Sequence, residues 1–153
     1  MRSTRKNIFF SASPRETAKL AQLVARIAAG ENSPNAFVVA LSGNLGTGKT
    51  VFTQALLKAF GVNDTVASPT FVLSREYILK KGRFKKAYHI DVYRLSAKEA
   101  CVLELRRIIK EKHALVLIEW AEKIKKIIPQ NALWIYFKHG KKIHERRIEI
   151  RNS

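Results

Sequence analysis

The pattern of hydrophobic and polar positions along the chain first indicates strands. Residues 37–41 and 115–118 form continuous apolar runs that lack the alternation of a half-exposed strand. Such runs, rich in β-branched residues, are typical of parallel strands buried on both faces. Along residues 132–138, aliphatic or phenylalanine side chains alternate with tryptophan, tyrosine or lysine side chains. A turn at residues 139–141 then leads to residues 142–151. This second pattern predicts an antiparallel hairpin at the end of the chain.

A helix is predicted after Ser13. The sequence there combines an N-cap serine, a proline at the first helical position and a glutamate three residues after the cap. Apolar residues then recur at helical spacing. We expect Leu20, Val24 and Ile27 to form the buried stripe of this helix, and Gly30 to end it.

Two more helices follow from similar signals. Residues 50–60 contain no glycine or proline, and the run stops before Gly61, a residue type suited to the end of a helix. Residues 96–99, Ser-Ala-Lys-Glu, form a second capping box. The helix that they open is expected to run to about residue 110, with Cys101, Leu105 and Ile108 on one face.

Shorter elements complete the pattern. Residues 8–10 fit a short edge strand, and residues 79–86 fit a basic hairpin tip with Gly82 in its turn. This hairpin would join a preceding strand to a strand at residues 87–93.

Residues 43–50 satisfy the phosphate-binding loop pattern G-x-x-x-x-G-K-[ST]. Glycines let the backbone approach a polyphosphate, so that successive N–H groups point at its oxygens. The loop follows an expected strand and opens an expected helix, so a chance glycine-rich turn is the weaker interpretation. Lys49 would reach the β- and γ-phosphates, and the Thr50 hydroxyl would bind Mg²⁺. The predicted nucleotide-binding residues of the loop are Gly43, Asn44, Leu45, Gly46, Thr47, Gly48, Lys49 and Thr50.

These elements predict an α/β fold. We expect residues 1–153 to form a single P-loop NTPase-like domain with a central mixed sheet. Its parallel core strands would be flanked by helices, with the antiparallel hairpin at the C-terminal end. A length of 153 residues suits one domain, and the single cysteine, Cys101, excludes an internal disulfide.

Two strands end in an acid, Asp91 and Glu119. A nucleotide hydrolase needs one carboxylate to hold Mg²⁺ and usually another polar group to orient the attacking water. On these grounds either acid could do either task, and Asp91 has the competing role of pairing with Arg94. Thr70 follows Pro69 at the mouth of an apparent strand, where a hydroxyl serves as a switch threonine or as an ordinary turn residue. His89 and His113 match no metal-site spacing, so neither receives a role.

The charge balance is strongly basic, with 29 Lys and Arg against 12 Asp and Glu, a net charge of +17. Such an excess favours an RNA, DNA or acidic protein partner, unless it reflects composition alone. The sequence shows no apolar run of membrane-spanning length and no signal-peptide core. We therefore expect a cytoplasmic protein that does not associate with a membrane.

Four motifs in order resemble the TsaE family, small bacterial ATPases required for making threonylcarbamoyladenosine on tRNAs that read codons beginning with A. They are GNLGTGKT (43–50), SPTF (68–71), HIDVYRL (89–95) and IEW (118–120). The phosphate loop is shared with many unrelated proteins, whereas the other three motifs in this order are far more specific. The family often has an acidic residue where Asn44 stands, alanine at Thr47, and a glycine in the helix after Tyr-Arg-Leu.

The resemblance implies a cytoplasmic ATPase that uses ATP and Mg²⁺ and works with the TsaD and TsaB proteins. By motif position, Lys49 would bind phosphate, and Thr50 and Glu119 would hold Mg²⁺. Asp91 would be needed for hydrolysis and Thr70 would be the switch-like threonine. Trp120 would lie near the nucleotide, with a packing role as the equal alternative.

Activity of the isolated protein is expected to be low. An arginine finger, an arginine that stabilises the transition-state charge, is worth roughly three to five powers of ten in rate. Within this chain only Arg94 can be named for that role, and only as a guess. One alternative is a small-molecule kinase, for which Arg83 is the only lid candidate. Another is a nucleotide-gated RNA-binding module that uses residues 80–86 and a C-terminal basic set. That set contains Lys138, Lys141, Lys142, Arg146, Arg147 and Arg151.

Overall fold

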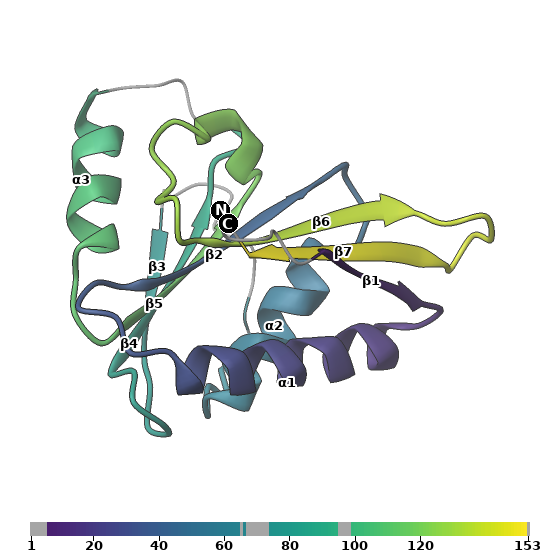
Figure 1. Ribbon diagram of the computed structural model, residues 1–153, viewed down its shortest axis with the longest axis horizontal. Coiled ribbons are helices and arrows are strands. Elements are labelled where there is room, and N and C mark those ends of the chain that lie inside the picture. Colours follow the sequence, from purple (N-terminus) through teal and green to yellow (C-terminus); the bar gives the residue numbers. More distant parts are fainter. Residues whose placement is uncertain (1–5, 65, 67–73, 95–98, 153) are drawn as a thin grey trace.

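The computed structural model describes residues 6–64, 66, 74–94 and 99–152 (Figure 1). In this part of the chain the strands form one seven-stranded sheet with the order β1-β7-β6-β2-β5-β4-β3. The strands are β1 (Lys6–Ser11), β2 (Phe37–Gly43), β3 (Ser74–Ile78), β4 (Lys86–Asp91), β5 (Ala114–Glu119), β6 (Leu133–His139) and β7 (Arg146–Asn152). The helices are α1 (Pro14–Gly30), α2 (Lys49–Ala59), α3 (Glu99–Ile109) and the 3₁₀ helix η1 (Ala121–Ile124).

The sheet is mixed, as the sequence predicts. Its central strands β6, β2, β5 and β4 are parallel, whereas β3 at one edge and β7 and β1 at the other are antiparallel to their neighbours. The apolar runs at residues 37–41 and 115–118 form the middle strand β2 and its neighbour β5, and both runs are buried throughout. The predicted α/β fold with parallel core strands is confirmed.

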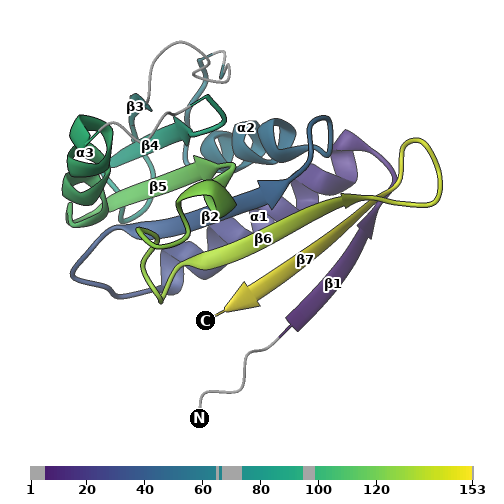
Figure 2. The ribbon, with the colours of Figure 1, turned by 90° about the horizontal axis from the view of Figure 1, so that it is seen from above.

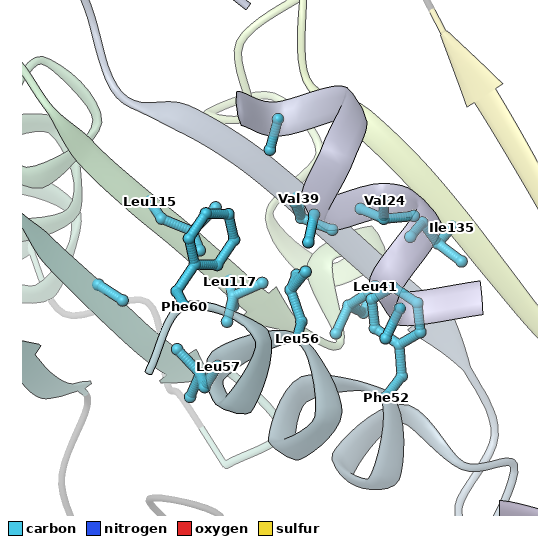
Figure 3. Packing of buried hydrophobic residues seen from close by; sticks show 14 of the residues in the cluster. Val24, Val39, Leu41, Phe52, Leu56, Leu57, Phe60, Leu115, Leu117 and Ile135 are labelled. Atoms are coloured by element: carbon cyan, nitrogen blue, oxygen red, sulfur yellow. The ribbon is translucent and has the colours of Figure 1, made fainter. Parts of the chain in front are cut away.

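Helices cover the sheet on both faces, as Figure 2 shows. The apolar side chains of α1 and α2 pack on one face in a single large cluster, while α3 and η1 belong to a second cluster on the other face. In the first cluster Phe52, Leu56 and Leu57 of α2 point at β2 and β5 (Figure 3). This packing fixes α2, and with it the phosphate loop, at the end of β2.

The first helix begins as predicted. The Ser13 side chain accepts a hydrogen bond from the Glu16 N–H at 3.2 Å, and the Glu16 carboxylate accepts one from the Ala12 N–H. The predicted buried stripe is wrong at one position, because Ile27 is exposed. The buried side of α1 passes through small residues that let the helix lie close to its neighbours. Its members are Thr17, Leu20, Ala21, Val24, Ala25 and Ala28.

The second helix ends before Gly61, as predicted, and Gly61 has a positive φ of 88°. The Gly61 N–H donates to the Lys58 carbonyl, and the Val62 N–H donates to the Leu57 carbonyl. This pair of hydrogen bonds is a Schellman motif, in which glycine takes the left-handed position after the helix.

The basic hairpin is also confirmed, with β3 and β4 antiparallel and Gly82 at a positive φ. The described part of α3 ends at Ile109 as expected; Leu105 and Ile108 are buried and Cys101 is half-buried. Its predicted cap at Ser96 lies outside the described residues. None of the described helices is long and apolar enough to cross a membrane.

The C-terminal hairpin is present, but its turn is longer than predicted. The second strand begins at Arg146, so the expectation that it starts at residue 142 is wrong. Residues 140–145 form a loop in which the Gly140 N–H donates to the Glu145 carbonyl at 2.7 Å. Because Glu145 also donates to the Lys142 carbonyl, these residues satisfy their backbone groups locally rather than in the strand pair.

Candidate nucleotide-binding site

Three parallel strands deliver the predicted site residues to one edge of the sheet. β2 ends at Gly43, β5 at Glu119 and β4 at Asp91. In the pairing register Glu119 stands beside Leu41 on one side and beside Asp91 on the other. Ligand sites of open α/β sheets lie in the crevice outside such carboxyl ends. The fold therefore brings the phosphate loop and both candidate acids together.

The phosphate loop depends on its glycines. Gly43, Gly46 and Gly48 have positive φ values of 151°, 72° and 99°. At Gly43 a Cβ would stand 2.5 Å from the Phe137 carbonyl oxygen of β6, so only glycine fits there without movement. The buried Thr47 hydroxyl donates to the Asn44 carbonyl at 2.6 Å and closes the loop on itself. The loop leads into the N-terminus of α2, where free backbone N–H groups favour an anion.

Lys49 lies across this loop. Its Nζ donates to the carbonyls of Gly43 and Asn44 at 2.5 and 2.9 Å and stands 4.0 Å from the centre of the Trp120 ring. The side chain is buried, and this burial lowers the pKa of Lys49; the carboxylates of Glu119, Glu122 and Asp91 oppose the shift. The ammonium is thus held inside the loop by acceptors on one side and an aromatic ring on the other.

Glu119 is the most enclosed acid of the site. Its carboxylate accepts hydrogen bonds from the Thr50 hydroxyl at 3.2 Å and from the Thr53 hydroxyl at 3.4 Å, both from α2. His89 on β4 places Nε2 2.8 Å from its Oε1. The family resemblance implies Thr50 and Glu119 as metal ligands, and the structure brings these two side chains into contact.

Hydroxyl and carboxylate oxygens are the ligand types that Mg²⁺ takes in phosphate-binding sites, so Thr50 and Glu119 fit a metal ion beside the loop. Among the described residues no group of three or more His, Cys, Asp or Glu could hold a metal by itself. A Mg²⁺ ion in this place would take its remaining ligands from phosphate oxygens and water, as it commonly does.

His89 and Thr53 are site residues that sequence reasoning missed. His89 is fully buried and contacts Glu119, although no role was predicted for it. The available signal was its position two residues before Asp91, since residues i and i+2 of a strand share a face. His113, for which no role was predicted either, precedes β5 at the opposite end of the strand from Glu119.

The outer part of the site is aromatic and charged. The Asp91 carboxylate accepts a hydrogen bond from the Tyr93 N–H at 2.9 Å, and the Tyr93 ring lies 4.6 Å from that of Trp120. Lys123 covers both rings and donates to the Tyr93 carbonyl at 2.7 Å. Trp120 has a φ of 60°, an unusual value for a bulky residue that turns the chain away from β5 at the site.

Several of these groups line a cleft of about 560 Å³, a size that suits a small-molecule ligand. Arg94, the residue considered as a finger, also borders it. Thr70 and the motif at residues 68–71 lie outside the described residues. The lining consists of Leu45, Gly46, Gly48, Lys49, Thr50, Val51, Asp91, Tyr93, Arg94, Glu119 and Trp120.

Comparison with known proteins identifies relatives. Residues 11–148 match the family described as threonylcarbamoyl adenosine biosynthesis protein TsaE. The tRNA threonylcarbamoyladenosine biosynthesis protein TsaE of Haemophilus influenzae is 36% identical over 99 residues, which cover 65% of this chain and 61% of that protein. The protein of the same name from Rickettsia conorii is 41% identical over 117 residues, covering 76% and 62%. The alignments thus span less than two thirds of the length of these two relatives.

Two further matches extend over more of the chain. The tRNA threonylcarbamoyladenosine biosynthesis protein TsaE of Bacillus subtilis is 35% identical over 127 residues, covering 83% of this chain and 74% of that protein. The crystal structure of Bacillus subtilis YdiB aligns with a TM-score of 0.76 at 28% identity. This superposition covers 99% of the present chain and 88% of YdiB.

Proposed function

The chain belongs to the TsaE family, as its motifs predict, and from this premise we propose that it is an ATPase of tRNA threonylcarbamoyladenosine biosynthesis. It would convert Mg-ATP to ADP and phosphate, and serve the modification of tRNAs that read codons beginning with A. The observation that carries the proposal is the contact of Thr50 with Glu119 beside a complete phosphate loop. We treat residues 1–153 as one ATPase domain in the cytoplasm.

The phosphate loop and α2 would bind the nucleotide. Backbone N–H groups of residues 43–50 would donate to the phosphate oxygens, with the N-terminus of α2 favouring their charge. Lys49 already donates to two loop carbonyls, and the charged oxygens of a β- or γ-phosphate are stronger acceptors than these. The Trp120 and Tyr93 rings would border the bound nucleotide on the open side of the cleft.

Thr50 and Glu119 would hold Mg²⁺, which neutralises charge that develops on the phosphates. His89 and Thr53 hold the Glu119 carboxylate in place. Asp91 stands next to Glu119 at the rim of the cleft, where a carboxylate can orient a water molecule for attack. We assign it the hydrolytic role, and Thr70 the switch role that its motif implies.

Turnover by the protein alone is expected to be slow, with stimulation by the TsaD and TsaB proteins. The only arginine among the described residues that lines the cleft is Arg94, which is exposed at its rim. An unfixed arginine contributes little to transition-state stabilisation, which requires a preorganised charge. A partner that fixes Arg94 or supplies its own arginine would raise the rate.

The test is ATP hydrolysis by the purified protein, alone and with TsaB, TsaD and tRNA. Stimulation by the partners that is lost in both Glu119→Ala and Asp91→Asn supports the proposal. Equal turnover with and without partners contradicts the partner dependence. ATP binding without any hydrolysis under either condition would remove the enzymatic role and favour a nucleotide-gated binding module.

The small-molecule kinase alternative needs an arginine lid over the phosphates, and the position of Arg83 does not suit that role. Arg83 lies in the connection before β4, whereas the cleft is at the other end of β4, where Asp91 stands. At about 3.3 Å per residue the length of β4 separates them by roughly 17 Å. The Arg83 guanidinium instead stacks on the Phe84 ring.

A further inference from the structure

The strands β6, β7 and β1 expose one face of the sheet. On β7, Ile148 and Ile150 belong to the core beneath α1 and α2, so the alternating residues between and beside them point the opposite way. Figure 2 shows this opposite side, with no described helix in front of β7 and β1. The pairing register adds residues of β6 and β1 to it. We call this surface the outer face; it contains Lys6, Ile8, Phe10, Trp134, Tyr136, Lys138, Arg147, Glu149 and Arg151. Of these, Trp134 is buried in the second cluster and Glu149 is buried beneath the basic side chains.

The outer face is strongly basic. It holds four cationic side chains and one acid, Glu149, which makes a net charge of four minus one, or +3. Glu149 is buried and contacts Lys6 at 3.2 Å, Arg147 at 3.2 Å and Arg151. The two guanidinium groups remain 30% and 44% exposed while this carboxylate holds them in position. They present fixed donors to an anion from solution.

Planar apolar groups lie among these cations. Phe10 is 66% exposed and pairs across the strands with Arg147, and Ile8 next to it is 43% exposed. The Arg151 guanidinium lies 4.7 Å from the centre of the half-buried Tyr136 ring. Exposed aromatic rings on a sheet, with arginine and lysine between them, supply both stacking surfaces and phosphate contacts.

We propose that the outer face binds single-stranded RNA. Arg147, Arg151 and Lys138 contact the phosphates, and Phe10 stacks with a base. Carboxylates of an acidic protein would satisfy the charges, but a nucleotide supplies both a phosphate for the arginines and a planar base for Phe10 in each repeat of its chain. The choice of RNA over DNA rests on the proposed role in tRNA modification. None of these residues lines the nucleotide cleft, so binding is separable from hydrolysis.

The structure also divides the basic regions considered in the sequence. The tip at residues 80–86 lies at the end of the sheet where β4 starts, whereas Lys138 lies where β6 ends. Since β4 and β6 run parallel within the sheet, these are opposite ends of the sheet. Arg151 pairs with Trp134 near the start of β6 and so lies at the same end as the tip, but the strands β6, β2 and β5 stand between them. The two sets therefore do not form one surface, and the outer face is the one that combines charge with an exposed aromatic ring, that of Phe10.

The experiment measures the fluorescence anisotropy of a labelled single-stranded RNA of about 12 nucleotides, a length within the usual site sizes, without added ATP. Phe10→Ala should weaken binding about tenfold, as loss of one stacked base does. Leu103→Ala is the matched control, because Leu103 on α3 is equally exposed, at 67%. Lys138→Gln should weaken binding more than Lys19→Gln, which removes the same charge from α1.

Each outcome of this binding experiment either supports or overturns the proposal that the outer face binds RNA. Weaker binding in Phe10→Ala and Lys138→Gln, unchanged ATP hydrolysis and a lower salt dependence in Lys138→Gln support the outer face. Equal losses in the control variants mean attraction by net charge alone and overturn the proposal. Competition by polyglutamate at equal charge, with no effect of Phe10→Ala, identifies an acidic protein surface and also overturns it. If the protein binds RNA but does not hydrolyse ATP under any condition, the proposed ATPase role is refuted and the proposal for the outer face stands.

Discussion

The Nε2 of His89 lies 2.8 Å from Oε1 of Glu119, and both side chains are buried at the junction of β4 and β5. A carboxylate only accepts, so Nε2 carries the proton, and Nδ1 is left buried without a hydrogen-bond partner among the described residues. The imidazole holds one oxygen of Glu119 from the strand side while the hydroxyls of Thr50 and Thr53 hold the carboxylate from α2. We propose that Glu119 binds the metal, and groups that orient a metal-binding carboxylate in this way tune a site without contacting substrate.

We therefore predict that His89→Ala lowers the rate of ATP hydrolysis about 10- to 100-fold, the usual effect of losing such a positioning residue. Nucleotide affinity should change little, because His89 does not line the cleft. His89→Gln retains a donor and should recover part of the rate. Steady-state kcat and nucleotide Kd provide the measurements, and His113→Asn is the control. An unchanged kcat in His89→Ala would show that the contact is only structural.

Thr50 and Thr53 allow a matched test of the proposed metal site. Both hydroxyls contact Glu119, but only Thr50 lines the cleft. Valine keeps the shape and removes the hydroxyl, so Thr50→Val should lower hydrolysis at least about 100-fold, more than the loss of an outer partner. It should also raise the Mg²⁺ concentration needed for half-maximal rate, whereas Thr53→Val should leave that concentration nearly unchanged. Equal Mg²⁺ requirements in the two variants would remove Thr50 from the metal site.

Gly43 and Gly46 differ in what a side chain would meet. Both have positive φ, but a Cβ on Gly43 would clash with the Phe137 carbonyl, while one on Gly46 meets nothing within 4 Å. We expect Gly43→Ala to lower the free energy of unfolding by roughly 2–4 kcal/mol through clash and strain. Gly46→Ala should cost about 1–2 kcal/mol, the strain of a left-handed conformation. Urea unfolding measures the free energy of unfolding of both variants. Similar losses in the two variants would mean that β6 shifts to accommodate the added methyl group.

Much of the fold was predictable because its signals are local. The phosphate loop, the buried runs of β2 and β5 and the Ser13 cap depend on residues within one element. Ile27 was misplaced because periodicity alone ranks isoleucine above alanine, whereas close packing of α1 selects Ala21 and Ala28 for the buried side. Local signals thus predict the position of an element in the chain more reliably than they predict which of its sides is buried.

The site was predicted less completely, since its contacts join distant segments. Lys49, Thr50 and Glu119 follow from motifs, but the role of His89 depends on β4 pairing with β5. That pairing joins strands separated by the whole of α3, and no residue pattern in either strand specifies its partner. The outer face likewise requires β1 to pair with β7, at the two ends of the chain. Such surfaces become visible only once the strand order is known.

Glu149 provides a prediction on stability and pH. Burial alone would raise its pKa, but hydrogen bonds from Arg151 and Lys6, with their charges, hold the pKa of Glu149 below its usual value. A carboxyl group whose pKa is lower in the folded state stabilises the fold above its unfolded pKa of about 4.5. This stabilisation is lost as the pH falls through the folded value. Glu149→Gln should therefore lower the free energy of unfolding at pH 7 by roughly 1–2 kcal/mol.

The difference between wild type and Glu149→Gln should then shrink as the pH decreases below about 4.5, because protonation makes the two side chains equivalent in charge. Urea unfolding at several pH values between about 7 and 3 measures it. Glu104→Gln is the control: Glu104 also pairs with an arginine, Arg107, but both side chains are exposed on α3. Its effect should be much smaller, since solvent screens exposed pairs. A constant difference across the pH range would mean that Glu149 stabilises β7 through packing and not through its charge.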